Sequence, residues 1–454
     1  MSEWQDAQSQ LVSFIRQTRF EDLPAELVAR TKRHLADTLG AGLVGATSQV
    51  AKEVSAVLLS EGATPLATLW GRKEYTSARN AALLNGIAAH AFELDDTGGC
   101  DHSGAVVIPA ILAILPLCQR VISGEELITA VVIGYDVARR VLEACGGYSA
   151  HNGAGWHSTS TCGVFGAAAA AARLLALDDS QISSALGIAG SFSGGLWAFI
   201  HDGSQSKKLH AGRAAEGGVL AVLSAQAGIS GPGQLFTARW GGFLQTLAPT
   251  TAEPAALVAE LGQTWKLLRC SIKPYASCRG THSAIDATGI LLQRLAVAGS
   301  DIAQVQITLS PFLYEMCGDE QISSLAAAQM SIRYAVAARL VYGHAGLDAY
   351  GGTQRRDPVL LAAIARVNLQ VDPTFSADGE PLVTLVSKQG DSLSLRVDIA
   401  LGAPANPIND EQLRDKFISL ACKALPVQQA GHLWRTVLSL EECDDVRVVE
   451  ALLR

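Results

Sequence analysis

Residues 202–218 read DGSQSKKLHAGRAAEGG, and the rest of the chain is organised around this stretch. Only 17% of the sequence is charged, yet four basic side chains lie here within a few residues of one another: Lys207, Lys208, His210 and Arg213. The preceding residues, 182–200, are apolar and rich in Gly and Ser, so we expect them to be buried. A cationic cluster at the wall of a core is destabilising unless an anionic partner or a ligand compensates it. The alternative is a helix N-terminus with a solvated basic face.

The overall composition predicts a large globular chain. It has 454 residues, of which 49% are hydrophobic, and this favours a helix-rich protein of two or three domains over a disordered one. The formal net charge of -8 argues against a nucleic-acid partner. An anionic substrate would need a local positive pocket to overcome that field, and residues 202–218 can supply it.

Cysteine usage and the N-terminus indicate where the protein works. The nine cysteines include no CxxC pair and show no regular spacing, which is typical of a reducing compartment rather than of disulfides or a zinc site. The first residues, MSEWQDAQSQLVSFIRQTRF, lack the basic-then-apolar order of a signal peptide. No apolar run is long enough to span a bilayer. We therefore expect a cytoplasmic protein with no membrane partner.

Hydrophobic periodicity predicts the domain organisation. Apolar residues recur at helical spacing through the first half of the chain, and the Ala-rich residues 163–175 should form a central helix because Ala faces pack closely. The pattern changes near residue 268, where strands are expected at 305–310 and 366–371 with a hairpin over 381–399. We predict a mainly α protein: a large all-helical domain, 1–265, completed by C-terminal helices in 403–454, and a smaller α+β lid domain, 266–402. Further helices are predicted at 3–17, 210–227, 254–261 and 326–341.

An acidic island follows a predicted helix that ends near residue 92. It contains Glu93, Asp95, Asp96, Thr97, Asp101 and His102. Carboxylates with an imidazole suit several divalent ions. Alternatively, the acids cap the helix that follows. Because no second His stands at a useful spacing, we expect no metal.

Three further polar islands interrupt the apolar chain. His157 precedes a Ser/Thr run whose free N–H groups could hold a carboxylate at the start of a helix, although capping alone would explain those hydroxyls. Lys207 or Lys208 could be a base if burial lowers its pKa. Residues 273–282, KPYASCRGTH, lie at the predicted domain junction, where pockets tend to form, or are a solvated loop. Together the islands suit one shared pocket.

In order and spacing, these islands resemble the blocks of the MmgE/PrpD family. The matching blocks are AHAFELDDT at 89–97, HSGAVVIPAILAI at 102–114, GWHSTSTCGVFGAAAAAARLL at 155–175, DGSQSKKLHAGRAAEGGVLAV at 202–222, KPYASCRGTHSAIDA at 273–287 and MSIRYAVAARLVYG at 330–343. The resemblance covers about residues 23 to 425. The family includes 2-methylcitrate dehydratase, cis-aconitate decarboxylase and iminodisuccinate epimerase. The resemblance implies a helical domain with an α+β lid, a homodimer and no cofactor.

The resemblance also assigns site residues motif by motif. The block with Asp95, Asp96 and Thr97 corresponds to the family's DDT, and the other matches are His102, His157, Lys207 with His210, and Lys273. Three departures from the family pattern stand out. The loop between Thr97 and His102 is shorter than usual, Ser103 lies where Pro is common, and Cys278 lies at a position where the decarboxylases that the chain resembles have a His. The last departure argues against simple transfer of a decarboxylase activity.

The resemblance leads us to expect proton, carboxylate or hydroxyl chemistry at a carbon next to a carboxylate. The predicted catalytic set is Lys207 and His102 as base and acid, with His157, Asp95 and Thr97. The predicted substrate-binding set is Asp96, Lys208, His210, Lys273, Tyr275, Cys278 and Arg279. The first hypothesis is a dehydratase of a 2-methylcitrate-like carboxylate. The alternative is an iminodisuccinate-like epimerase that pairs Lys207 with Cys278, Tyr275 or a His; a cis-aconitate-type decarboxylase and a non-catalytic polycarboxylate binder rank below it.

Overall fold

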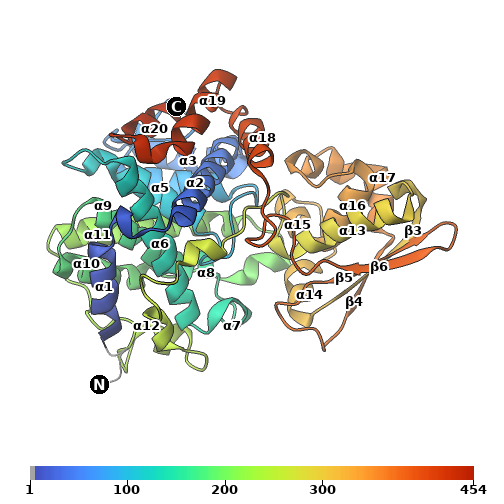
Figure 1. Cartoon of the computed structure of the whole chain (residues 1–454), viewed down its shortest axis with the longest axis horizontal. Helices are drawn as coiled ribbons and strands as arrows, with labels where there is room; N and C mark the ends of the chain where they lie inside the picture. The colour runs from blue at the N-terminus through green and yellow to red at the C-terminus, as the bar shows by residue number, and fades with distance from the viewer. Residues whose placement is uncertain (1–5) are drawn as a thin grey trace.

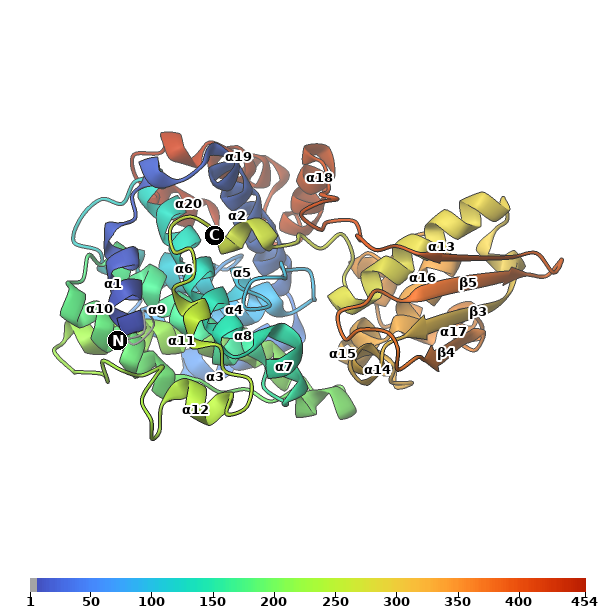
Figure 2. The ribbon, with the colours of Figure 1, turned by 60° about the horizontal axis from the view of Figure 1, so that its bottom comes forward.

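The computed structural model describes residues 6–454, which form two bodies standing side by side (Figures 1 and 2). The larger body is helical, and the smaller one contains a four-stranded sheet with helices packed on it. This confirms the predicted fold class, mainly α with a smaller α+β domain. Residues 3–5 of the first predicted helix lie outside the described part of the chain.

The helical body holds most of the helices and one short hairpin. They are α1 (Ala7–Gln17), α2 (Ala25–Gly45), α3 (Gln49–Ser60), β1 (Ala67–Thr68), β2 (Tyr75–Thr76), α4 (Ala78–His90), α5 (Gly104–Ile114), α6 (Gly124–Ala144), α7 (Gly147–Gly153), α8 (Ser158–Thr161), α9 (Gly163–Leu174), α10 (Asp179–Ala189), α11 (Ser206–Gln226) and α12 (Phe243–Leu247). After the α+β domain the chain returns as α18 (Asp410–Ala421), α19 (Val427–Leu438) and α20 (Arg447–Leu452). Helices α18 and α19 pack against α2. The domain limits at residues 265 and 402 stay a prediction.

The Ala-rich helix α9 is central, as the sequence predicts. All of its residues except Arg173 are buried, and it packs against α5, α6 and α11. A Cβ added to Gly166 would lie 2.4 Å from the carbonyl oxygen of Gly134 in α6, and one added to Gly218 of α11 would lie 2.4 Å from the Cβ of Ala167. Small side chains therefore let these helices approach closely, and this packing sets the position of α11.

Helix α11 begins at Ser206, four residues before the predicted start at 210. Lys207 and Lys208 therefore lie in its first turn, and both are buried at 4% exposure. Arg213 instead points outward and pairs with Glu216. The two lysines of the basic cluster are therefore buried, and only Arg213 fits the alternative of a helix N-terminus with a solvated basic face.

The α+β domain is a sheet with helices on it. Its strands are β3 (Ile302–Leu309), β4 (Val367–Val371), β5 (Leu382–Ser387) and β6 (Ser392–Arg396), and its helices are α13 (His282–Leu295), α14 (Pro311–Cys317), α15 (Leu325–Met330), α16 (Ile332–Tyr342) and α17 (Pro358–Ile364). The strand order is β4-β3-β5-β6, with β3 parallel to β4 and the other neighbours antiparallel. Helix α13 packs against β5 and β6, and α16 packs against β4 and α13. Apolar side chains of β3 and β5 enter the core between sheet and helices.

Two predicted helices differ from the structure. The helix expected over 326–341 is broken at Ser331, whose backbone is extended and whose hydroxyl accepts the N–H of Tyr334 to cap α16. The helix expected over 254–261 is a single 3₁₀ turn, Pro254–Leu257, and the positive φ of Glu260, 50°, prevents its continuation.

The connections between the two bodies are tied together. Thr97 and Ser271 exchange backbone hydrogen bonds of 3.1 and 2.7 Å, so the outgoing connection is fixed to the acidic island. The N–H of Ile272 donates to the carbonyl of Gly402, which lies on the returning connection, at 3.0 Å. The junction of the domains is therefore built against the polar islands.

Candidate active site

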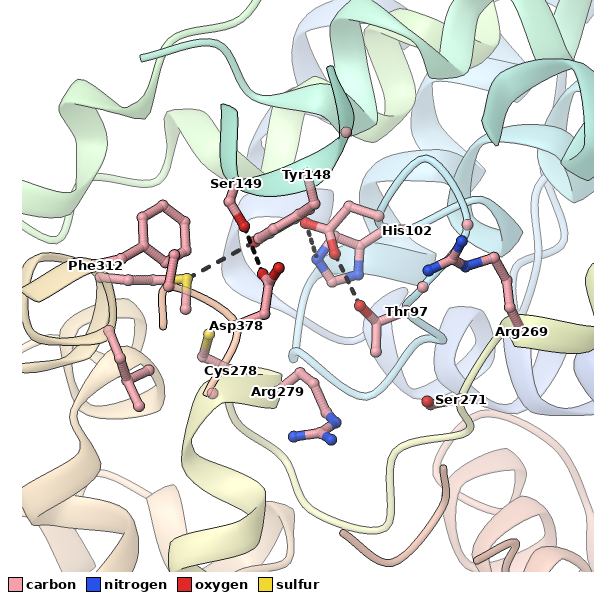
Figure 3. Close-up of a pocket in the computed structure, with 18 of the residues that line it drawn as sticks. Thr97, His102, Tyr148, Ser149, Arg269, Ser271, Cys278, Arg279, Phe312 and Asp378 are labelled. Atoms are coloured by element: carbon pink, nitrogen blue, oxygen red, sulfur yellow. Dashed lines mark hydrogen bonds and ion pairs between the residues drawn. The ribbon is translucent and has the colours of Figure 1, made fainter. Parts of the chain in front are cut away.

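A cavity of about 570 Å³ opens where the two domains meet (Figure 3). The helical domain contributes Tyr148 and Ser149 of α7, and the α+β domain contributes Phe312 and Met316 of α14. Polar lining residues include Glu93, Thr97, Asp101, His102, Arg139, Lys207, Arg269, Ser271, Lys273, Cys278, Arg279, Asp378 and Glu380. The structure therefore brings residues from three of the four sequence islands to one cavity, whereas the island with His157 does not line it.

Three lysines converge on the carboxylate of Glu93 inside this site. Glu93 is 1% exposed; its Oε1 accepts a hydrogen bond from Lys207 Nζ at 2.8 Å and also contacts the ammonium of Lys208. Lys273 Nζ lies 3.4 Å from Oε2 of the same carboxylate. Burial would raise the pKa of Glu93, but the lysines outweigh it and hold this pKa well below its ordinary value. Glu93 is therefore ionised and is the buried partner that the cationic stretch requires.

The two lysines of α11 have opposite proton affinities. Burial lowers the pKa of Lys208 to about 8, with Lys207 adding to the effect. Burial also opposes the charged form of Lys207, but the adjacent Glu93 outweighs it and raises the pKa of Lys207 above its ordinary value. Lys207 lines the cavity, whereas Lys208 lines only a smaller void behind it. The lysine that reaches the cavity therefore holds its proton, which does not fit a free base.

A chain of buried histidines and carboxylates lies beside the lysines. Nδ1 of His90 is 3.0 Å from Asp95, and Asp95 Oδ2 is also 3.0 Å from Nδ1 of His102. Nε2 of His102 lies 3.3 Å from Asp101 Oδ2, and Thr97 donates to Asp101 Oδ1 at 2.8 Å. Each carboxylate thus fixes the orientation of an imidazole, and Thr97 in turn holds the carboxylate of Asp101.

His102 is held in its protonated form. Its Nδ1 faces Asp95 and the carbonyl of Asp96, and its Nε2 faces Asp101, so both nitrogens have acceptors. Burial lowers the pKa of His102, but Asp101 and Asp95 raise it more, and the net pKa lies above its ordinary value. His90 lies behind it with a pKa lowered to about 4 by burial, so His90 is neutral. His102 is therefore a proton donor at the cavity wall.

The acidic island adopts a strained backbone. Glu93 has φ of 53° and Asp101 has φ of 101°, a region that side chains other than Gly rarely adopt. Both side chains line the cavity, so the unusual backbone at each end of the island directs a carboxylate into the cavity. Strain of this kind is concentrated at functional sites because the surrounding structure must hold it.

His157 and His210 form a neutral pair next to this chain. Their Nδ1 atoms lie 2.8 Å apart, and Nε2 of His157 is 3.2 Å from the hydroxyl of Thr159 and 3.8 Å from Asp101. Burial lowers the pKa of His157 well below its ordinary value and that of His210 to about 4. Neither residue lines the cavity, so we expect them to support Asp101 rather than meet the substrate.

Not every predicted substrate-binding residue reaches the cavity. Asp96 accepts hydrogen bonds from Tyr135 at 2.6 Å and from the N–H of Gly104 at 2.9 Å, and it lies 3.0 Å from His34 Nδ1. Its carboxylate is therefore committed to the start of α5. Tyr275 donates to Asp286 at 2.5 Å and lines a separate depression in the α+β domain. The structure thus separates these two residues from the site.

Cys278 and Arg279 enter the cavity from the α+β domain (Figure 3). Hydrogen bonding from Cys317 lowers the pKa of the Cys278 thiol to about 6 against the effect of burial, with Lys207 assisting. Arg279 donates to Glu380 at 2.8 Å. The lowered pKa favours the thiolate of Cys278, which lines the same cavity as Lys207, while the charge of Arg279 is balanced within its own domain.

Sequence reasoning did not select three residues that the geometry places at the centre: Glu93, Asp101 and His90. Glu93 and Asp101 belong to the acidic island, but the spacing of its four carboxylates did not indicate which of them would lie at the centre of the site. A signal existed for Glu93, since buried lysines need a buried counter-ion. His90 ends α4 and lies within the quoted block at 89–97, but the resemblance assigned it no role.

In the described part of the chain three sets of side chains have the geometry of metal ligands; one is Cys145, His151 and Cys162, and the other two belong to this site. Ligand atoms of His90, Asp95 and His102 lie within 4.8 Å of one another, and so do those of Asp101, His102 and His157. The sequence argument against a metal rested on the lack of a second His, and the fold supplies His90 and His157. The hydrogen bonds among these groups already provide partners for both carboxylates, and the expectation of no metal stays a prediction.

These features define a class of protein: a two-domain enzyme with an acid–base cavity at the domain junction. Models of the MmgE/PrpD N-terminal domain and the MmgE/PrpD C-terminal domain match residues 9–255 and 275–442. The chain belongs to the MmgE/PrpD family, as the motifs predicted. Among the described residues, no helix is both long and apolar enough to cross a membrane.

Curated relatives resemble the chain over almost its whole length. It is 27% identical to the cis-aconitate decarboxylase-like protein oryM of Aspergillus oryzae, over 98% of this chain and 96% of that one. It is also 27% identical to the cis-aconitate decarboxylases of Homo sapiens, over 95% and 91%, and of Aspergillus terreus, over 95% and 93%. The likeness therefore includes both domains and the junction between them.

Proposed function

We propose that this protein is a lyase that acts on a small polycarboxylate at a carbon next to a carboxylate. The observation that carries the proposal is that Lys207 and His102 both line the cavity with raised pKa values. Lys273 adds a further buried cation. Such a site binds carboxylates electrostatically and offers a proton from two directions.

Decarboxylation fits these protonation states best. When a carboxylate leaves as CO₂, the electron pair of the broken C–C bond stays on the carbon, and that carbon then takes a proton. The step needs a proton donor and no base at the start. Lys207 or His102 can donate, and the relatives named cis-aconitate decarboxylase support this assignment.

Cys278 favours a second candidate, the dehydration expected from the sequence. A dehydratase must remove a proton from carbon and protonate the departing hydroxyl. The Cys278 thiolate could remove the proton while Lys207 or His102 protonates the hydroxyl, because all three line one cavity. The same thiolate, paired with the protonated His102 that lines the same cavity, would serve an epimerase.

Proton NMR in D₂O distinguishes these reactions. The purified protein is incubated separately with cis-aconitate, 2-methylcitrate, citrate and iminodisuccinate. Release of CO₂ with one deuterium in the product supports decarboxylation. New alkene signals from a citrate indicate dehydration, and deuterium exchange with a change of diastereomer indicates epimerisation. A folded protein that changes none of the four overturns the proposal.

A further inference from the structure

A second cationic cluster contributes to the lining of the same cavity, and it is built around Glu143 of α6. Arg139 Nε lies 2.9 Å from the Glu143 carboxylate, Lys266 Nζ lies 2.7 Å from it, and Arg269 Nη1 lies 3.0 Å from it. Only Arg139 and Arg269 among these cations line the cavity. The guanidinium of Arg269 is turned toward the side of His102 and Thr97 (Figure 3).

This cluster carries more positive charge than its own structure needs. Three cations share one carboxylate, which leaves an excess of two positive charges. Burial and the neighbouring Arg139 both lower the pKa of Arg269, as expected where like charges crowd together. A carboxylate of a ligand would relieve that repulsion.

Attachment of the domain connection to α6 does not explain the excess. Asp136 of α6 already holds this segment: it accepts the N–H of Lys266 at 2.9 Å and pairs with the buried Arg140, which in turn donates to the carbonyl of Ala259 at 2.6 Å. That attachment uses one cation for one carboxylate. The side chain of Arg269, by contrast, donates to Glu143 through Nη1 but is 49% exposed, so its remaining N–H donors are accessible to a ligand.

We infer that Arg139 and Arg269 form a subsite for a carboxylate of the substrate remote from the reacting carbon, so that the substrate is a tricarboxylate rather than a dicarboxylate. The inference rests on the proposed function. Lys207 and Lys273 hold the reacting end, and the arginines hold the distal carboxylate through their planar, multiple donors. Because the whole chain has a formal charge of -8, a focused positive subsite is needed to attract a trianion.

The test compares Arg269→Gln with Lys266→Gln. Both variants remove one cation from Glu143, but only Arg269 lines the cavity. Binding is measured by calorimetry with propane-1,2,3-tricarboxylate and with 2-methylsuccinate, which lacks one terminal carboxylate. Loss of a charged hydrogen bond should weaken tricarboxylate binding to R269Q about tenfold or more, and 2-methylsuccinate binding less than twofold. The K266Q variant should change both by less than threefold.

Three results would overturn the subsite: no change in R269Q, equal weakening of both ligands in R269Q, or equal effects of R269Q and K266Q. Calorimetry needs no turnover, so this result is independent of the NMR assay. If R269Q loses binding of the tricarboxylate alone and no substrate is turned over, the subsite is supported and the proposed lyase function is overturned. If a substrate is turned over but R269Q weakens both ligands equally, the lyase function is supported and the subsite is overturned.

Discussion

The cavity has two cationic clusters, and each places three cations around one glutamate. Around Glu93 the cations are lysines, all buried, and Asp95 and Asp101 lie among the adjacent histidines. Around Glu143 the cations are two arginines and a lysine, and Arg269 is half-exposed. Both clusters therefore have more cations than carboxylates, but the first is buried beside two further carboxylates, while the second is partly open to solvent.

The difference between the clusters follows from the cost of burying charge. An uncompensated ion is strongly destabilising in a dry interior, so the Glu93 cluster needs carboxylates of its own and can use its charges only for proton transfer and close contact. Near solvent the same excess is tolerated, and it can attract an anion over a distance. The proposed roles thus place chemistry at the buried cluster and capture of the substrate at the cluster that is open to solvent.

The largest effect should come from Lys207, one of the two lysines of the Glu93 cluster that line the cavity. Replacing Lys207 by Ala removes a proton donor and a carboxylate contact, and turnover should fall about 10³-fold, within the range of general-acid contributions. Arg213→Ala is the matched control, because Arg213 lies on the same helix and points outward. Steady-state kinetics with the substrate identified by NMR measures both. Retained turnover in K207A, with an unchanged melting temperature, would contradict the assignment.

Removing the carboxylate of Glu93 should lower the free energy of unfolding strongly, because its three partners are buried. Glu93→Gln leaves three buried ammonium groups without a counter-ion and should destabilise the protein by about 3–5 kcal/mol in urea unfolding. The control is Glu216→Gln, since Glu216 is also buried but its partners Arg79 and Arg213 are 46% and 55% exposed and can return to water. Its loss should cost about 1 kcal/mol. Equal losses in the two variants would refute the buried-cluster argument.

The carboxylate of Glu93 should also make the stability of the protein fall in acid. The folded-state pKa of Glu93 is depressed, so its contribution to stability is present above the unfolded pKa, about 4.3, and is lost as pH falls through the folded pKa. The stability difference between wild type and E93Q should therefore narrow in acid. A difference that stays constant down to acid unfolding would contradict the depressed pKa.

Sequence patterns predicted the fold class because periodicity and small-residue packing are local signals. The helix over 163–175 and the strands of the sheet follow from such signals, whereas the break at Ser331 depends on a cap that an apolar pattern hides. Motifs located the lysines of α11 but not which carboxylate meets them, because the left-handed backbone of Glu93 decides its direction.

The second cluster shows the limit of sequence reasoning more clearly. Arg139 and Glu143 have the i, i+4 spacing of an ordinary surface pair, and Arg269 follows them by more than a hundred residues. No local pattern relates the three. They meet only because the connection to the α+β domain runs back across α6, where Lys266 is fixed to Asp136.

The titration of His102 should limit the activity at alkaline pH. Its active form is protonated and its pKa is raised in the folded protein, so kcat/KM should be constant in mild acid and fall as pH rises through a value above the ordinary 6.5. The stability that protonated His102 provides follows the same direction: it is complete below 6.5 and lost as pH rises through the folded pKa. In His102→Gln, activity should drop about 10²-fold and this limb should disappear.

His210 is the matched control for this pH profile. Its pKa is lowered to about 4, so it is already neutral where His102 titrates. In His210→Asn the alkaline limb should keep its midpoint whatever the rate. A limb that disappears in H210N, or that persists unchanged in H102Q, would assign the titration to another group.

Cys278 should show the smallest effect, and it decides between the two candidate reactions at the Glu93 cluster. In a decarboxylase the thiolate is not needed for the first step, so Cys278→Ser should change kcat less than threefold. If Cys278 is the base of a dehydratase or an epimerase, kcat should fall about 10²-fold or more.

Cys317→Ala sharpens the test, because the hydrogen bond from Cys317 is the largest cause of the lowered pKa of Cys278. For a base at Cys278, C317A should move the acidic limb of kcat/KM to higher pH, since the thiolate would then form only at higher pH; for a decarboxylase, both variants should retain the wild-type profile.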